Sequence, residues 1–306
     1  MNIAEIISPL IFIASLGFIC AKTKWLSKNQ LDGISKLTFN IFIPAFLFFS
    51  MANAKLDQTL DFGFFLGFYF PVLLCFFIAA TSNYFLNAKY HHDLQASAVF
   101  ALASSYSNTV IVGLPILVML FGEQAIILIF AIVTFHSALL FTLTSALSTQ
   151  NQQLKWYETL LNTFNNPLLI SILAGALINL LGLTLPTIIN ESLKLLTKPA
   201  ITLALFILGA SLTFYPLRKG LKFVALATLI KLLLLPLIVY LSASYFFHLS
   251  LIQIKVLVVL SACPTGVNAY LIAKNAHTHE QTVATTVVAS TLLSVITLSF
   301  WLWWLS

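Results

Sequence analysis

Long apolar stretches recur roughly every 25–30 residues along nearly the whole chain, and they constrain its fold more than any other feature. The hydrocarbon core of a bilayer is about 30 Å thick, so a helix needs roughly 20 apolar residues to cross it. Only 8% of the residues are charged, whereas soluble domains usually have about 25%. The apolar runs are continuous, as in residues 229–241, and lack the alternation typical of barrel strands. The sequence therefore predicts an all-α integral membrane protein.

Ten of these stretches have the length and composition of membrane spans. Short polar segments separate them, and the longest of these connections is residues 149–165. The predicted spans are residues 3–21, 31–52, 62–86, 94–120, 124–148, 166–184, 192–213, 221–247, 252–274 and 281–304. The chain then consists of a first half (1–148), a connecting loop (149–165) and a second half (166–306).

Lysine and arginine are distributed unevenly between the loops on the two sides of the predicted bundle. The odd-numbered loops carry Lys22, Lys24, Lys28, Lys89, Lys155, Arg218, Lys219, Lys222 and Lys274, and the even-numbered loops and their flanks carry Lys55, Lys194, Lys198 and Lys255. The side richer in these residues is normally cytoplasmic. We therefore expect a cytoplasmic central loop and both termini on the outer, periplasmic face. Topology also accounts for the net charge of +6, so nucleic acid is not expected as a partner.

Residues of the first half recur in the second half at a nearly constant offset. Pro9-Leu10 and Gly17 match Pro167-Leu168 and Gly175 at an offset of 158, Leu37-Thr38 and Ala45 match Leu196-Thr197 and Ala204 at 159, and Glu123-Gln124, Thr134 and Ser137 match Glu280-Gln281, Thr291 and Ser294 at 157. Because each half has an odd number of spans, the second half must enter the membrane from the opposite face. We predict two inverted five-helix repeats, a plan typical of secondary transporters.

The fourth and ninth predicted spans both carry polar residues, proline and glycine near their middle. The fourth contains Ser107, Asn108, Thr109, Gly113 and Pro115, and the ninth contains Pro264, Thr265, Gly266 and Asn268. Proline lacks an N–H and clashes with the carbonyl four residues earlier, so both helices should break. Unwound backbone at membrane depth is tolerated only where it is buried in protein or lines a polar cavity. Since the breaks fall at corresponding positions of the two halves, these nine residues are predicted to bind the substrate.

Four segments of the chain resemble the auxin efflux carrier family of membrane transporters. They are LTFNIFIPAFLF (37–48), SNTVIVGLPIL (107–117), LFILGASL (205–212) and CPTGVNAYLIA (263–273). Together with the ten spans and the short central loop, the resemblance covers the full chain. Plant members often have a long central loop, which this chain lacks, so it is more similar to compact bacterial members.

The resemblance implies a fold shared with bile-acid symporters and sodium/proton antiporters. Spans 1, 2, 6 and 7 would form a scaffold, and spans 3–5 and 8–10 would form a transport domain in which the broken spans 4 and 9 cross. It also implies a multi-pass protein of the bacterial inner membrane, a homodimer by analogy, and dicarboxylates such as malate or malonate as substrates. No cofactor is implied.

Charged and titratable residues within the spans give further expectations. All nine acidic residues lie near span ends or in loops, which argues against a cation as substrate and favours an organic anion. Lys231 lies deep in span 8 and is either a substrate counter-charge or gate, or a structural residue that snorkels or pairs with backbone carbonyls. His136 in span 5 is either a titratable coupling group or a hydrogen-bond partner between helices. Asn40 and Pro44 in span 2 form either a scaffold kink or part of the cavity wall.

The expected function is therefore that of a secondary carrier for small organic acids, embedded in the lipid bilayer and driven by a proton, sodium or substrate gradient. No metal site and no enzymatic activity are expected. An intramembrane hydrolase is one alternative, and it would need Ser104 or Ser107 beside His136, but no carboxylate lies at mid-span to orient that base. A channel-like facilitator is the other, although channels are commonly built around a symmetric pore.

Overall fold

The computed structural model describes residues 3–54, 62–87, 89, 92–148, 166–214 and 221–305, with side chains omitted for residues 3–7, 123 and 124. The predicted connecting loop, residues 149–165, lies outside these described residues. In the described ranges every regular element is a helix. Six of these helices are long and apolar enough to cross a membrane, and further apolar helices are shorter. The prediction of an all-helical, multi-pass membrane protein is therefore confirmed.

The chain divides into two compact units. The first unit comprises Met1–Thr59, Leu114–Thr134 and Asn162–Phe214, and the second comprises Leu60–Gly113, Phe135–Leu161 and Tyr215–Ser306. The first contains α1 (Ile3–Lys22), α2 (Lys28–Leu37), η1 (Thr38–Phe42), α3 (Ile43–Ala52), α6 (Leu114–Phe121), η3 (Gly122–Ala125), α9 (Pro167–Leu180), α10 (Thr187–Thr197), α11 (Ala200–Ser211) and η4 (Leu212–Phe214). The second contains α4 (Phe62–Leu86), α5 (Leu94–Ser105), η2 (Thr109–Gly113), α12 (Leu221–Leu229), η5 (Ile230–Leu234), α13 (Leu235–Leu241), η6 (Ser242–Phe246), α14 (Leu251–Ala262), α15 (Val267–Asn275) and α16 (Glu280–Trp304). Helix α7 (Ile126–Ser148) runs from the first unit into the second.

Proline explains three π-helical segments within these helices. Segments η1, η2 and η5 are each followed, at the second residue of the next helix, by Pro44, Pro115 and Pro236 respectively. A proline nitrogen cannot donate to the carbonyl four residues earlier, and a local widening of the helix accommodates that lost bond. Helix periodicity alone does not reveal these widened turns, because a π-helical turn adds only one residue to each hydrogen-bonded loop.

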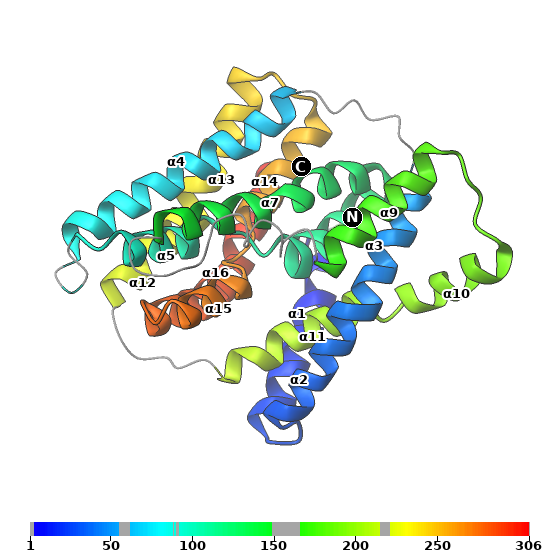
Figure 1. Cartoon of the computed structure of the whole chain (residues 1–306), viewed down its shortest axis with the longest axis horizontal. Coiled ribbons are helices and arrows are strands. Elements are labelled where there is room, and N and C mark those ends of the chain that lie inside the picture. Colours follow the sequence, from blue (N-terminus) through cyan, green and yellow to red (C-terminus); the bar gives the residue numbers. More distant parts are fainter. Residues whose placement is uncertain are drawn as a thin grey trace. The chain divides into compact units, whose positions relative to one another are not determined.

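Close backbone contacts hold the first unit together. Helix α1 packs on α11, and α3 packs on α9 (Figure 1). A Cβ atom built on Gly17 would lie 2.0 Å from the carbonyl oxygen of Phe206, and one on Gly209 would lie 1.7 Å from that of Ala14. At the second contact, a Cβ on Gly175 would lie 2.6 Å from the carbonyl oxygen of Phe48. Only glycine allows the helix backbones to approach this closely.

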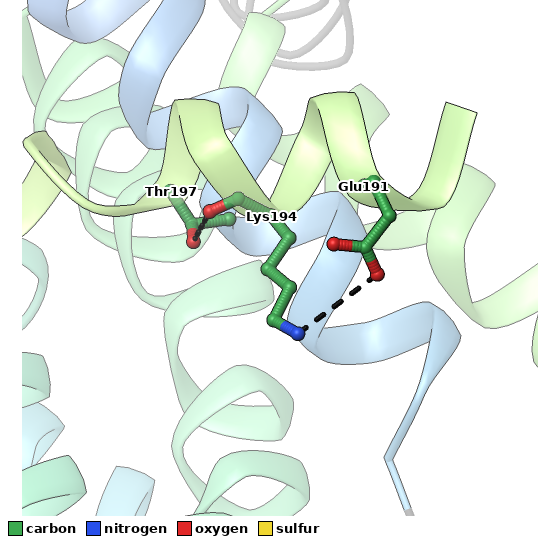
Figure 2. A network of polar contacts seen from close by, with 3 residues as sticks. All are labelled: Glu191, Lys194 and Thr197. Atoms are coloured by element: carbon green, nitrogen blue, oxygen red, sulfur yellow. Dashed lines mark hydrogen bonds and ion pairs between the residues drawn. The ribbon is translucent and has the colours of Figure 1, made fainter. Parts of the chain in front are cut away.

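Helix α10 carries its polar groups on an exposed surface. Lys194 Nζ lies 3.9 Å from a carboxylate oxygen of Glu191, and the Thr197 hydroxyl donates to the Lys194 carbonyl over 2.8 Å (Figure 2). Both charged side chains are more than half exposed. Such an ion pair contributes about 0–1 kcal/mol, so packing rather than this pair holds α10 in place.

Two short helices form the buried centre of the second unit. Residues Ala96–Ser105 of α5 and Val256–Ala262 of α14 are buried on every side. Helix α4 packs on α5, α13 packs on α14, and α16 packs on both α12 and α14. Side chains cap both buried helices at their N-termini: the Asp93 carboxylate accepts from the Ala96 N–H, and Ser250 forms a capping box with Gln253. At the C-terminal ends of α5 and α14, where the chain unwinds, the last backbone carbonyls have no partner within their own helix and need other hydrogen-bond donors.

Candidate functional site

Two unwound segments cross in the second unit, where α5 and α14 end. Residues 106–108 follow α5 and residues 263–266 follow α14, and an isolated antiparallel bridge joins Ser107 to Thr265. The Asn108 N–H donates to the Pro264 carbonyl over 2.8 Å, and the Gly266 N–H donates to the Tyr106 carbonyl over 3.0 Å. Breaks of spans 4 and 9 were predicted at these positions, and the structure brings the two together.

The bonds at this crossing follow a single sequence offset. The bridged residues, Ser107 and Thr265, have numbers that differ by 158, which is also the offset between Gly17 and Gly175. Adding this offset converts the bond from Asn108 to Pro264 into the bond between Gly266 and Tyr106. The two bonds therefore join pairs of residues that this offset relates to each other.

Different donor groups form hydrogen bonds to the carbonyls at the C-terminal ends of the two buried helices. The Thr265 hydroxyl donates to the Ala103 carbonyl of α5 over 2.8 Å. At the equivalent position of α14, the Lys231 amine donates to the Ser261 carbonyl over 2.5 Å. The carbonyl end of a helix carries a partial negative charge, which a cation stabilises. Lys231 is 0% exposed. It pairs with a backbone carbonyl, which was one of the alternatives left open by the sequence.

His136 and Tyr106 hold the first unwound segment in place. The Ser107 N–H donates to His136 Nε2 over 3.0 Å, and the Tyr106 ring stacks on the imidazole with centroids 5.1 Å apart. The Tyr106 hydroxyl lies 2.9 Å from Ser137 Oγ and accepts a 3.4 Å bond from the Asn268 amide. His136 was predicted as a partner between helices or a titratable group, and its observed bond is to the crossing itself.

Three donor groups beside the crossing have no hydrogen-bond partner among the described residues. They are Ser107 Oγ, Asn108 Nδ2 and His136 Nδ1. Because Nε2 of His136 accepts a hydrogen bond, a neutral imidazole carries its proton on Nδ1, which is then a donor as well. The three residues are 1%, 6% and 1% exposed. A buried polar group without a partner costs about 1–3 kcal/mol, so this cluster favours a ligand that supplies acceptors.

The other predicted site residues are placed as follows. Thr109 begins η2, and its N–H donates to the Ser107 carbonyl over 2.9 Å. Gly113 ends η2, where an added Cβ would meet Leu260 at 2.8 Å. Pro115, Asn40 and Pro44 belong to the first unit, whereas the crossing belongs to the second. Asn40 is exposed and lies in η1, while Pro44 is buried at the start of α3.

Sequence analysis missed Tyr106, Ser137 and Ser290 as site residues. Tyr106 lies within the polar run of span 4, between Ser105 and Ser107, which was the available signal. Ser290 on α16 accepts from the Thr265 N–H over 3.0 Å. Hydroxyl residues are frequent along α16, so no sequence signal distinguishes Ser290 from its neighbours.

Replacing Gly266 with alanine tests whether the crossing tolerates added volume. The new Cβ would lie 2.3 Å from the Tyr106 ring, which His136 and Ser137 hold in place. We expect destabilisation by about 1–3 kcal/mol. Thermal unfolding in detergent measures this effect, with Gly33→Ala as the control because nothing lies within 4 Å of a Cβ there. Wild-type stability in Gly266→Ala would contradict this geometry.

Comparison with known proteins gives matches along nearly the entire chain. A family model described as "Membrane transport protein" matches residues 2–158 and 154–302. The chain is 22% identical over 303 residues to "Uncharacterized transporter YfdV" of Escherichia coli (strain K12), covering 96% of this chain and 95% of that protein. It is 21% identical over 304 residues to the "Putative malonate transporter" of Rhizobium meliloti (strain 1021), covering 97% and 94%. It is 24% identical over 346 residues to auxin efflux carrier component 8 of Arabidopsis thaliana, covering 94% and 93%.

Proposed function

The chain belongs to the membrane transport protein family, which includes auxin efflux carriers, and from this premise we propose that it is a secondary active carrier of small organic anions. The family match confirms the resemblance predicted from four sequence segments, and it identifies a transporter rather than an enzyme. The proposed carrier works by alternating access around the crossing of residues 106–108 and 263–266.

The observation that carries the anion proposal is the cluster of buried donors at the crossing. Ser107 Oγ, Asn108 Nδ2 and the Nδ1 of a neutral His136 can each donate a hydrogen bond. A carboxylate only accepts hydrogen bonds when ionised, and it can accept several at once. The cluster therefore has the donor chemistry that a carboxylate requires.

The buried charge of the second unit also favours an anion as the substrate. Among the described residues, the buried polar side chains include Lys231 but no aspartate or glutamate. A cation at the crossing would normally be held by carboxylates or several carbonyls. A protonated Lys231 instead creates a positive potential that attracts an anion, and the low dielectric of the interior strengthens this attraction.

The constant sequence offset supports a carrier built from two inverted five-helix repeats. Bonds at the crossing are equivalent at an offset of 158, and so are the glycine contacts of the first unit, because Gly17 meets Phe206 and Gly175 meets Phe48. Inverted repeats place a substrate site where they meet, near mid-membrane. In the proposed mechanism, spans 1, 2, 6 and 7 act as the scaffold, and spans 3–5 and 8–10 present the crossing alternately to the two aqueous sides. The termini would face the periplasm and the central loop the cytoplasm.

Dicarboxylates are the proposed substrate class. One relative is named "Putative malonate transporter" and another auxin efflux carrier component 8. Malonate and auxin are both organic acids. Malonate is small, carries two carboxylates at neutral pH and therefore offers acceptors to the donor cluster and negative charge to the potential of Lys231, which makes it the first probe.

Hydrolysis and channel activity are the alternatives. A hydrolase would need a serine hydroxyl bonded to His136, but His136 Nε2 accepts from the backbone N–H of Ser107. The Ser104 hydroxyl donates to the Phe100 carbonyl within its own helix. A channel would show flux that does not saturate, because its permeation does not require a conformational cycle for each solute molecule.

Uptake of labelled malonate into proteoliposomes tests the proposal. The expected result is saturable uptake that other small mono- and dicarboxylates inhibit and that equally small cations and neutral amides do not. Chemical conversion of malonate, followed by mass spectrometry in the same vesicles, would indicate an enzyme. Flux that rises linearly with concentration, or inhibition by cations instead of carboxylates, would contradict the proposal.

Replacing Lys231 with glutamine tests the role of its charge. Glutamine can still donate a hydrogen bond to the Ser261 carbonyl, but it carries no positive charge. We expect the KM for malonate to rise by about tenfold or more, since a hydrogen bond or ion contact to a charged group contributes about 1.5–3 kcal/mol. The control is Lys194→Gln on the exposed surface of α10, which should leave KM unchanged. An unchanged KM in Lys231→Gln would show that the lysine acts only as a helix cap.

A further inference from the structure

The bond between the Ser107 N–H and His136 Nε2 makes the crossing sensitive to a proton. An imidazole nitrogen accepts a hydrogen bond only while it carries no proton itself. Protonation of Nε2 therefore breaks this 3.0 Å bond and leaves the Ser107 N–H without its acceptor. We propose that His136 Nε2 is the binding site of a coupling proton, through which this carrier uses a proton gradient. The inference rests on the proposed function as a carrier of organic anions.

The equivalent bond in the second half has no such sensitivity. The Thr265 N–H donates to the hydroxyl oxygen of Ser290 over 3.0 Å, and residue 265 is the counterpart of residue 107 at the offset of 158. A serine hydroxyl keeps its acceptor lone pairs over the whole physiological pH range. The two unwound segments are thus held by matching bonds, of which only the first can be broken by a proton. Of these two bonds, only the one to His136 therefore depends on pH.

The surroundings of His136 fix its ring and penalise an uncompensated charge. Phe68 and Tyr69 of α4 contact one side of the imidazole, and Tyr106 stacks on it with an interplanar angle of 10°. The ionisable groups that act on it are Tyr69 from α4, Tyr106 from the crossing and Lys231 from η5. A protonated Lys231 repels a second positive charge, and the buried side chains of the described residues include no carboxylate to offset it.

An anion at the crossing offsets the positive charge of a protonated His136. A carboxylate beside Ser107 and Asn108 supplies the negative charge that a protonated His136 lacks, and it can accept from the Ser107 N–H once Nε2 is protonated. Proton and anion then favour each other's binding, and by linkage each raises the affinity for the other by the same factor. The proton comes from water on one side of the membrane and forms an N–H bond at Nε2; this bond breaks again when the proton is released to water on the other side. The carrier is thus a symporter of one proton with each anion.

The test is malonate accumulation in proteoliposomes with the membrane potential clamped at zero. A pH lower outside by one unit should drive the wild-type protein to an accumulation ratio of about ten, because one pH unit corresponds to about 1.36 kcal/mol per proton. His136→Gln retains an amide oxygen that can accept from Ser107 but cannot titrate. It should exchange internal for external malonate, at a lower affinity because the Nδ1 donor is gone, yet show a ratio near one. His248→Gln, at an exposed histidine of the second unit, is the matched control and should reach the wild-type ratio.

The outcomes separate this inference from the proposed function. Wild-type accumulation ratios in His136→Gln would overturn the proton site, as would a wild-type ratio that ignores the pH gradient while malonate exchange persists. Absence of any malonate exchange in the wild type would overturn the carrier and the site together. His136→Asn provides a second amide that cannot titrate, should the glutamine variant fail to fold. Proton uptake by the solubilised wild-type protein on malonate binding, measured by calorimetry in two buffers of different ionisation enthalpy, is a further check, and no uptake would contradict the site.

Discussion

Asn108→Ala is expected to lower the apparent affinity for malonate by about 10- to 100-fold without unfolding the protein. The Asn108 side chain is 6% exposed, and its Nδ2 has no partner among the described residues, so its removal breaks no internal bond of that donor. The backbone bond from the Asn108 N–H to Pro264 remains available to alanine. A hydrogen bond to a charged acceptor contributes about 1.5–3 kcal/mol, which corresponds to the expected loss. Initial uptake rates over a range of malonate concentrations measure it.

The matched control for this substitution is Asn29→Ala, because Asn29 is exposed on α2 in the first unit. It should leave both the uptake rate and the KM unchanged. If Asn108→Ala transports malonate with wild-type kinetics, the crossing is not the substrate site. If it unfolds at a lower temperature than the wild type, Asn108 has a structural partner and the donor cluster loses its main support.

Gly209→Ala is expected to have the largest effect on stability. A Cβ there would lie 1.7 Å from the carbonyl oxygen of Ala14 and 2.5 Å from its carbonyl carbon. Both are backbone atoms in α1, so the collision is relieved only if α1 and α11 move apart and lose their packing. We expect destabilisation by about 3 kcal/mol and an unfolding temperature lower by about 6–12 °C in detergent.

Gly33→Ala in the same unit is the control for this prediction. Nothing lies within 4 Å of a Cβ at Gly33 in α2, so alanine should be neutral or stabilise the helix by about 0.5–1 kcal/mol. Gly17→Ala should resemble Gly209→Ala, because its Cβ would meet the Phe206 carbonyl of the facing helix. Equal unfolding temperatures for Gly209→Ala and Gly33→Ala would contradict the close approach of these helices.

Much of the helical pattern could be predicted from apolar length alone. The third predicted span, 62–86, coincides with α4, and the tenth, 281–304, differs from α16 by one residue. The second break was also predictable, since Pro264 cannot continue a regular helix. The first break was predicted between Ser107 and Pro115, and the structure places the unwound residues at 106–108, ahead of η2 and of Pro115 in α6. The π-helical turns themselves were not predicted, because a proline indicates a local disturbance of a helix but not the form that it takes.

The chemistry of the crossing depends on tertiary contacts that the sequence does not encode locally. The bond from Lys231 to the Ser261 carbonyl joins residues of different helices, so the sequence left its role open between counter-charge and cap. The same holds for the bond from Ser107 to His136 and for the acceptor Ser290. Asn40 was left open between a scaffold kink and a cavity wall; the structure places it in η1, the π-helical turn that precedes Pro44, with its side chain exposed.

Counterflow of malonate tests the carrier most directly. Proteoliposomes loaded with unlabelled malonate are diluted into a trace of labelled malonate, with no pH gradient and the potential clamped at zero. A carrier that alternates around one site should accumulate the label transiently above its equilibrium level, because internal malonate returns the site to the outside. Asn108→Ala should lose this overshoot at low malonate concentrations, whereas Asn29→Ala should keep it. Entry of label that only approaches equilibrium, with no overshoot in the wild type, would contradict the account.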